Sequence, residues 1–299
     1  MTWIQIVILA VIQGLAELLP VSSSAHVIAA AKLMRGRGAT GSSPLDPSSP
    51  QFTLLLVMLH TGTMFAVIVY FWKAWQKAFF SSREQFMRAL RLVVIATAVT
   101  GVLGYGLKIG IEKFLAHQNH SANVKAEIEQ LFGHLELLAI ALAAAGVLIL
   151  VAGFRSRGKS EREVLTDGDA VGIGAIQGLC LPFRGFSRSG ATISVGMLRG
   201  VSKRLLEEYS FALAVVLTPA VIGREAWRLI KHKSETGAAV PLGFNDFTPS
   251  LIGMVVSFFA GLVALKVLSG LLENGKWWIF GVYCLVAAGA VFGMYQMGY

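Results

Sequence analysis

The chain has 299 residues, of which 55% are hydrophobic and only 14% are charged, and its mean hydropathy is +0.65. Soluble domains carry about 25% charged residues, so this composition excludes an ordinary water-soluble protein and predicts a polytopic integral membrane protein. The formal net charge is +9. Because the basic residues gather in polar connections, we assign this charge to membrane orientation and anionic lipid headgroups, and we expect no nucleic-acid partner.

In chain order, the first apolar region is Met1–Met34, which the polar segment ELLPVSSSAH interrupts. A second interrupted region, Val171–Leu198, contains the segment LPFRGFSRSGAT. Irregular backbone at membrane depth occurs only where it is buried in protein or lines a cavity. We therefore expect each interrupted region to form two short helices joined by a bend, as a re-entrant hairpin.

The remaining apolar stretches are long enough to cross a bilayer, which takes about 20 residues. Three precede the second interrupted region and three follow it, at Gln51–Trp72, Leu92–Ile109, Leu131–Gly153, Leu205–Gly223, Ser250–Gly270 and Trp277–Gly298. Their polar connections are Arg35–Pro50, Lys73–Arg91, Gly110–Gln130, Phe154–Ala170 and Arg224–Pro249. The predicted fold class is all-α, with six full spans and two re-entrant hairpins.

The two interrupted regions are similar to each other. IQGLAELLPVSSSAHVIAAAKLMRG from Ile12 and IQGLCLPFRGFSRSGATISVGMLRG from Ile176 align without gaps at an offset of 164 residues, with seven identities in 25 positions. Three spans, an odd number, separate the two hairpins, so re-entrant hairpins would enter from opposite faces. This pattern predicts an inverted-topology repeat within one membrane domain of residues 1–299. The first repeat covers about 1–109 with hairpin 1–34, and the second about 131–298 with hairpin 171–200.

The second interrupted region places an arginine where a charge is costly. Arg188 keeps its proton, needs a partner inside a membrane protein and suits phosphate or carboxylate. Ser187 stands where a helix is expected to begin, so it is a candidate cap for a helix N-terminus that attracts anions.

The first interrupted region repeats this arrangement. Ser22, Ser23 and Ser24 precede another apolar run and predict a second serine-capped helix start. Gln13 and Glu17 are four residues apart on one helix face, and Glu17 is a candidate cation ligand or base. His26 titrates near neutrality and is a candidate acid, base or nucleophile.

Each of these residues also has a simpler interpretation. Serine serves tight helix packing in membranes, and Glu17 with Arg188 can form a buried ion pair that only joins the two halves. We expect His60 to pack or hydrogen-bond within its span rather than to act as a ligand. Cys180 and Cys284 lie in apolar runs, and no disulfide is expected.

The two polar segments resemble the two signature segments of the BacA-type undecaprenyl pyrophosphate phosphatases. The first family pattern, (Glu/Gln)-x-x-x-Glu followed by Pro-Val-Ser-Ser and His, corresponds to Gln13, Glu17, Pro20, Val21, Ser22, Ser23 and His26. The second, Pro-Gly-x-Ser-Arg-Ser-x-x-Thr, corresponds to Gly185, Ser187, Arg188, Ser189 and Thr192. The chain departs from the second pattern at Arg184, which replaces the family proline. In the first pattern Gln13 cannot ionise, so cation binding or base catalysis by the pair Gln13 and Glu17 depends on Glu17.

The resemblance implies a hydrolase that converts undecaprenyl pyrophosphate to undecaprenyl phosphate and inorganic phosphate. It implies lipid-carrier recycling for cell-wall synthesis, bacitracin resistance, a Mg²⁺ or Ca²⁺ requirement, and a bacterial inner membrane with the active site facing the periplasm. The excess of Lys and Arg on the side of Lys73–Arg91 has the sign that this orientation requires.

The expected site follows from these residues. Substrate-binding candidates are Ser22, Ser23, Ser187, Arg188, Ser189 and Thr192; catalytic candidates are Glu17, Ser23, His26 and Arg188; and metal-binding candidates are Glu17 and Gln13. The nucleophile stays open between Ser23, His26 and a metal-activated water. The expected partners are the polyprenyl diphosphate and membrane lipid, with a homodimer as an open alternative. The competing class is a transporter or flippase for a polyprenyl phosphate or another amphipathic anion, because inverted repeats with broken helices are typical of secondary transporters.

Overall fold

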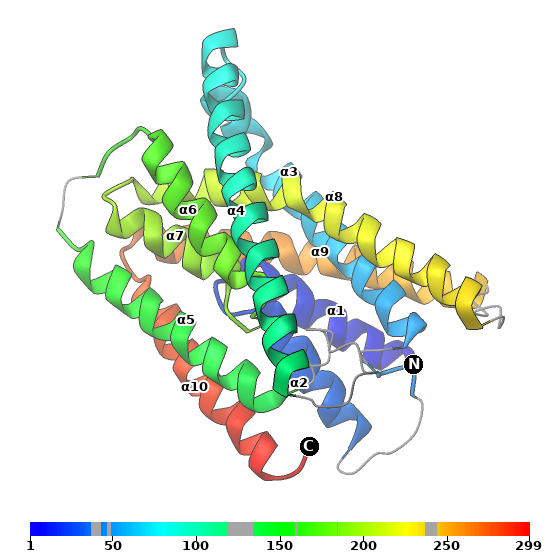
Figure 1. Ribbon diagram of the computed structural model, residues 1–299. Helices are drawn as coiled ribbons and strands as arrows, with labels where there is room; N and C mark the ends of the chain where they lie inside the picture. Colours follow the sequence, from blue (N-terminus) through cyan, green and yellow to red (C-terminus); the bar gives the residue numbers. More distant parts are fainter. Residues whose placement is uncertain (37–42, 47–48, 119–133, 159–160, 184, 237–243) are drawn as a thin grey trace.

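The fold is all-helical in the part of the chain that the computed structural model describes, residues 1–36, 43–46, 49–118, 134–158, 161–183, 185–236 and 244–299. Its helices (Figure 1) are α1 (Trp3–Leu18), α2 (Ser23–Arg35), α3 (Pro50–Ala78), α4 (Arg83–Gln118), α5 (Leu135–Arg155), α6 (Asp167–Cys180), α7 (Arg188–Leu198), α8 (Lys203–Thr236), α9 (Phe244–Glu273) and α10 (Trp278–Gln296). These residues form no strand, and Arg162 and Val201 make an isolated β-bridge. The predicted fold class is therefore confirmed at the level of an all-helical, multi-pass chain.

Five of the described helices, α3, α4, α5, α9 and α10, are long and apolar enough to cross a membrane. They coincide with five of the six predicted spans. The sixth, Leu205–Gly223, lies inside α8, which is not among these five helices. Helix α8 carries two buried acids in its first turns, Glu207 and Glu208.

The helices extend further into the charged segments than we predicted. Lys73–Arg91 was expected to be one polar connection, yet α3 continues to Ala78 and α4 begins at Arg83. Similarly, α8 continues to Thr236, well into the expected connection Arg224–Pro249. Hydropathy falls where the apolar stretch ends, but Lys, Arg, Gln and Glu are good helix formers and allow the helix to continue. Parts of the connections Arg35–Pro50 and Gly110–Gln130 lie outside the described residues.

Both interrupted regions form two helices joined by a bend, as predicted. At the first bend, Ser22 has φ of +66°, and it is the single non-glycine residue with positive φ among those described. At the second bend, Gly185 has φ of +117°, and a Cβ there would lie 2.8 Å from the carbonyl oxygen of Leu138. Glycine is therefore required at this bend both for its backbone conformation and for the close approach of α5.

The two halves of the chain pack in matching ways. Helix α1 packs against α9, and α6 packs against α4, while α5 and α10 lie side by side (Figure 1). Gly14 of α1 and Gly178 of α6 are equivalent at the offset of 164 residues. A Cβ on Gly14 would lie 2.7 Å from the Ser257 carbonyl oxygen, and one on Gly178 would lie 3.1 Å from the Thr100 carbonyl oxygen. The equivalent glycine thus allows a close helix approach in both halves, as small residues do in membrane proteins.

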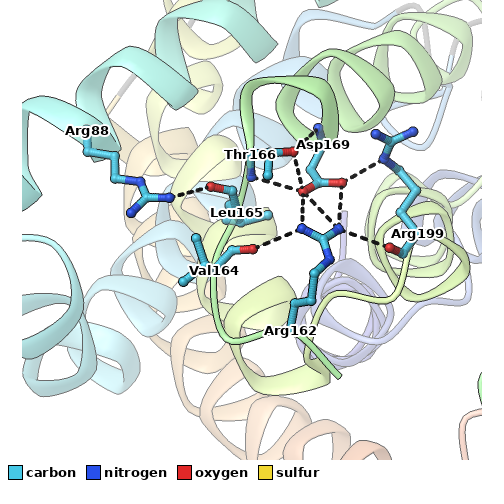
Figure 2. A network of polar contacts seen from close by, with 7 residues as sticks. All are labelled: Arg88, Arg162, Val164, Leu165, Thr166, Asp169 and Arg199. Atoms are coloured by element: carbon cyan, nitrogen blue, oxygen red, sulfur yellow. Dashed lines mark hydrogen bonds and ion pairs between the residues drawn. The ribbon is translucent and has the colours of Figure 1, made fainter. Parts of the chain in front are cut away.

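The free ends of the second hairpin are joined by a polar network (Figure 2). The fully buried carboxylate of Asp169 accepts hydrogen bonds from Thr166, from both terminal nitrogens of Arg162 at 3.2–3.3 Å and from Arg199 Nε at 2.8 Å. Arg162 also donates to the carbonyl oxygen of Arg199 at 3.0 Å. Because Asp169 lies in the first turn of α6 and Arg199 directly follows α7, one carboxylate holds together the two helix ends that lie away from the bend. We expected α6 to begin at Val171; the capping box of Thr166 and Asp169 extends it to Asp167.

The largest cluster of buried apolar side chains lies where the two bends meet the long helices. It includes Val21 beside the first bend, Ile193 of α7, Phe211 of α8 and Trp277 immediately before α10. The bends therefore rest on a packed core, which fixes the polar side chains described next.

Candidate active site

The two bends, distant in sequence, touch each other. A Cβ on Gly190 in the first turn of α7 would lie 3.2 Å from Pro20 Cβ of the first bend. Glu17 in the last turn of α1 consequently faces Arg188, the first residue of α7, with 3.9 Å between Oε1 and Nη2. The predicted meeting of these two residues is confirmed.

Glu17 is the centre of the polar contacts at the site. Its Oε2 accepts a hydrogen bond from the Ser23 hydroxyl at 2.5 Å and another from Gln13 Nε2 at 3.1 Å. Gln13 and Glu17 thus share a helix face as their spacing predicted. His60 Nε2 of α3 lies 3.6 Å from the same carboxylate oxygen.

Arg188 is largely buried, and among the described residues Glu17 has the single carboxylate within 4 Å of its guanidinium. Its distance from Glu17 exceeds that of a hydrogen bond, and its other contact among the described residues is a long one, 3.4 Å from Nη1 to the carbonyl oxygen of Ser210. A cation inside a membrane protein normally pairs closely with an anion. The guanidinium is therefore available to bind an anionic group.

The start of α7 has the geometry of an anion site. The Ser187 hydroxyl caps the helix by accepting from the Gly190 N–H at 3.3 Å, as predicted. The first N–H groups of the helix, at Arg188 and Ser189, have no acceptor within the helix. Together with the helix dipole they favour negative charge beside the guanidinium.

Thr192 and Ser189 are placed differently from Arg188. Both are buried in α7, and the Thr192 hydroxyl lies 2.6 Å from the hydroxyl of Ser210 on α8. This contact fixes α7 against α8. Arg184, which replaces the family proline, lies outside the described residues.

The expected serine cap of α2 is wrong. Ser22 occupies the N-cap position, yet its side chain accepts no capping hydrogen bond. Its positive φ does not give the extended backbone that an N-cap residue adopts. The Ser23 hydroxyl, the next along the chain, is directed to Glu17 instead, so a tertiary contact replaces the local cap.

His26 lies in α2 but binds groups other than Glu17 and Arg188. Its Nδ1 lies 2.8 Å from the Ser22 carbonyl oxygen, and its Nε2 lies 2.8 Å from the hydroxyl of Tyr283 on α10. These are its hydrogen bonds within the described residues. The bends thus bring Glu17, Ser23 and Arg188 together and leave His26 at the side that α10 covers.

We predicted that His60 packs or hydrogen-bonds within its span, and its Nδ1 does lie 2.8 Å from the Leu56 carbonyl oxygen, but its position 3.6 Å from Glu17 was not predicted. Helix α3 packs against α1, which places His60 beside Glu17. Tyr283 and Ser210 were missed as well. A polar residue inside an apolar span gives no local sign of its partner, because helix packing decides which polar residues meet.

The side chains at this site can bind a divalent cation only if phosphate oxygens of the substrate supply further ligands. Within the described residues, no three His, Cys, Asp or Glu side chains gather into a metal-binding group. Mg²⁺ is usually held by one or two carboxylates together with phosphate oxygens. Glu17, with Gln13 beside it, fits a cation whose coordination is completed by a bound diphosphate.

Cys180 and Cys284 are both free, so no disulfide joins them.

The fold and the site define a multi-pass membrane protein in which two bent helix pairs converge on a carboxylate, a serine and an available arginine. The chain belongs to the family described as "Bacitracin resistance protein BacA", whose model matches residues 6–290. The resemblance of the two polar segments is thereby confirmed.

Curated relatives cover nearly the whole chain. It is 52% identical over 292 residues to "Undecaprenyl-diphosphatase 2" of Acinetobacter baylyi, with 97% of both chains covered. It is 31% identical to "Undecaprenyl-diphosphatase" of Syntrophotalea carbinolica, with 98% of this chain and 99% of the relative covered. It is also 31% identical to the protein of that name from Gluconobacter oxydans, covering 97% and 99%.

Proposed function

We infer that this chain hydrolyses undecaprenyl diphosphate to undecaprenyl phosphate and inorganic phosphate, and that it acts in recycling the lipid carrier for cell-wall synthesis, with bacitracin resistance as a consequence. The single observation that carries this function is the convergence of Glu17 and Ser23 on Arg188, from two bends, in a chain 52% identical to an undecaprenyl-diphosphatase. The enzyme is a hydrolase that acts on a diphosphate anhydride.

The diphosphate binds at the start of α7. Arg188 forms charge-assisted hydrogen bonds to the phosphate oxygens, and the free amides at the helix start add donors to them. These groups stabilise the charge that develops during phosphoryl transfer. Ser187, Ser189 and Thr192 maintain this helix start, because the first caps it and the others are buried within α7.

Ser23 is the nucleophile that the geometry favours. Its hydroxyl donates to Glu17 at 2.5 Å, which is the arrangement of a nucleophile and its general base. The Ser23 oxygen attacks the terminal phosphorus while its proton passes to Glu17, and the bond from that phosphorus to the bridging oxygen breaks to release undecaprenyl phosphate. A water molecule then attacks the phosphoserine, which releases inorganic phosphate and restores the Ser23 hydroxyl.

A divalent cation, Mg²⁺ or Ca²⁺, is the cofactor that this site would take. Glu17 and Gln13 would hold it, together with phosphate oxygens of the substrate. When bound, it would neutralise charge on the phosphate oxygens. Arg188 supplies the same kind of stabilisation from the opposite bend.

We propose that α1–α2 and α6–α7 are re-entrant hairpins that enter a bacterial inner membrane from opposite faces. The three long apolar helices between them, α3, α4 and α5, support this inverted topology. The distribution of Lys and Arg supports a site that opens toward the periplasm.

The test is phosphate release from a polyprenyl diphosphate by the purified chain in detergent, without a second compartment. The substitution Arg188→Ala removes the guanidinium, and Glu17→Ala removes the general base. Each is expected to lower kcat/KM at least ~100-fold, the scale of one oxyanion donor or one general base. Matched controls are Arg157→Ala and Glu84→Ala, both at exposed positions, which are expected to retain activity.

Near-normal turnover in Arg188→Ala or Glu17→Ala would overturn the assigned roles. Absence of phosphate release by the wild-type chain would overturn the hydrolase itself. In that case a transporter or flippase becomes the function to test.

A further inference from the structure

Both ring nitrogens of His26 are engaged, and the partners fix which of them carries a proton. Nδ1 lies 2.8 Å from the carbonyl oxygen of Ser22, and a carbonyl oxygen only accepts hydrogen bonds. Nδ1 therefore carries the proton. In the neutral imidazole, Nε2 then accepts a hydrogen bond from the Tyr283 hydroxyl at 2.8 Å.

Tyr283 is also packed against the imidazole. The two rings stack with centroids 5.6 Å apart and planes 16° from parallel. Since the residues are 257 positions apart, this contact joins α10 at the end of the chain to α2 at its beginning.

Helix α10 is anchored to both hairpins beside this contact. The Cys284 thiol donates to the Pro20 carbonyl oxygen of the first bend at 3.4 Å. Trp277, directly before α10, donates from Nε1 to the Ser194 hydroxyl of α7 at 3.0 Å. The stretch of α10 that carries Tyr283 is consequently held by both hairpins, although the tyrosine itself is 46% exposed.

We propose that Tyr283 is a positioning residue of the hydrolase, which holds the imidazole of His26 in place through the stacked ring and the hydrogen bond to Nε2, while the Ser22 carbonyl oxygen fixes the Nδ1–H tautomer. This inference rests on the proposed function and extends it, because the family signature contains His26 but no residue of α10. The hydroxyl acts through His26 and has no contact with Glu17 or Arg188 among the described residues. Without it, Nε2 loses its hydrogen-bond partner, and the imidazole can rotate away from the Ser22 carbonyl oxygen.

The kinetic test is a double-mutant cycle of Tyr283→Phe and His26→Ala, with phosphate release as the readout. Phenylalanine keeps the stacked ring and removes the hydroxyl alone. We expect Tyr283→Phe to lower kcat about tenfold, the effect of one lost hydrogen bond, while KM stays within about twofold. In the His26→Ala background the same change is expected to alter kcat less than twofold, because the residue through which it acts is gone. Tyr295→Phe is the matched control: Tyr295 lies on the same helix and is 44% exposed, close to the 46% of Tyr283, whereas the hydrogen bond to His26 comes from Tyr283.

A second measurement reports on the contact without any activity. In ¹⁵N-histidine spectra of the detergent-solubilised chain, the His26 signals are those that disappear in His26→Ala. We expect a protonated Nδ1 and an unprotonated, hydrogen-bonded Nε2 in the wild type, and a changed Nε2 signal in Tyr283→Phe, where that hydrogen bond is lost.

Specific outcomes overturn the proposal. An unchanged kcat in Tyr283→Phe, or the same tenfold loss with and without His26, shows that Tyr283 does not act through His26. An Nε2–H tautomer in the wild type, or identical spectra for Tyr283→Phe and wild type, shows that the Tyr283 hydroxyl does not donate to Nε2. If the wild type releases no phosphate, the proposed function fails, while the spectra still test the positioning of His26.

Discussion

At the scale of single residues, the geometry between Glu17 and Arg188 indicates a binding site rather than an ion pair with a purely structural role. A pair that only joins two helices is expected to have close, bidentate hydrogen bonds, because each charge must be compensated for the loss of water. Here Oε1 and Nη2 are 3.9 Å apart, and Glu17 directs its other oxygen to Ser23 and Gln13. This spacing leaves the guanidinium able to bind a phosphate.

His60 provides a prediction at the same scale. Its Nδ1 lies 2.8 Å from the Leu56 carbonyl oxygen and therefore carries a proton, which leaves Nε2 facing Glu17. We expect His60→Ala to lower kcat about tenfold or more with little change in KM, because the carboxylate that serves as the general base loses the imidazole packed beside it.

The measurement is steady-state phosphate release by His60→Ala. His134→Ala is the matched control, because His134 is an exposed histidine that pairs with Glu136 at the start of α5. Equal kcat values for the two variants would show that His60 only packs between α3 and α1.

At the scale of helices, the second hairpin depends on the network around Asp169. Burial alone would raise the pKa of this carboxyl, but hydrogen bonds from Thr166, Arg199 and Arg162 hold the pKa well below its ordinary range. Because the folded-state pKa is below the unfolded one, the stabilisation is present above the unfolded pKa and is lost as pH falls through the folded pKa. Its contribution is therefore expected to stay constant from pH 8 to about pH 5.

Neutralising this carboxylate tests the network. Asp169→Asn leaves Arg162 and Arg199 facing each other without their shared anion, which we expect to cost about 1–3 kcal/mol, since both arginines are partly exposed. For a chain of this size the midpoint of thermal unfolding is expected to fall by roughly 2–8 °C.

The control for this prediction is Asp167→Asn, which removes an exposed ion pair with Arg91. Exposed pairs contribute about 0–1 kcal/mol, so its midpoint is expected to stay close to that of the wild type. Equal midpoints for the two variants, measured by thermal unfolding in detergent, would refute a stabilising role for the Asp169 network.

The helices also show which local features the sequence is able to predict. The bends were predictable because polar segments interrupt two apolar regions, and the cap of α7 because Ser187 directly precedes a helix. The cap of α2 was not, since Ser23 has a partner in Glu17 that no local pattern shows. The helix ends that lie beyond the apolar stretches were not predicted, because hydropathy indicates which residues lie in the membrane and not where a helix ends.

At the scale of the whole molecule, the two repeats share their packing and differ in their chemistry. Gly14 and Gly178 make equivalent close approaches to neighbouring helices. At the offset of 164 residues, however, Leu181 is equivalent to Glu17, and Ser24 is equivalent to Arg188. One repeat thus supplies the carboxylate and the other the cation, which gives one asymmetric site rather than two equal ones.

This asymmetry limits what the alignment of the two halves predicts. The duplication indicated that two bends exist and that they meet, and Glu17 and Arg188 were identified because charges are rare in apolar regions. His60, Ser210 and Tyr283 come from α3, α8 and α10, outside the duplicated segments. Their place at the site follows from the packing of long helices, which no motif in this sequence describes.

The most direct measurement is an experimental map of the purified protein with bound inorganic pyrophosphate. We predict density for the diphosphate at the start of α7, with its oxygens within hydrogen-bond distance of the Arg188 guanidinium and a phosphorus atom facing the Ser23 hydroxyl. Pyrophosphate bound elsewhere, or a map in which Arg188 is remote from Glu17 and Ser23, would contradict the account.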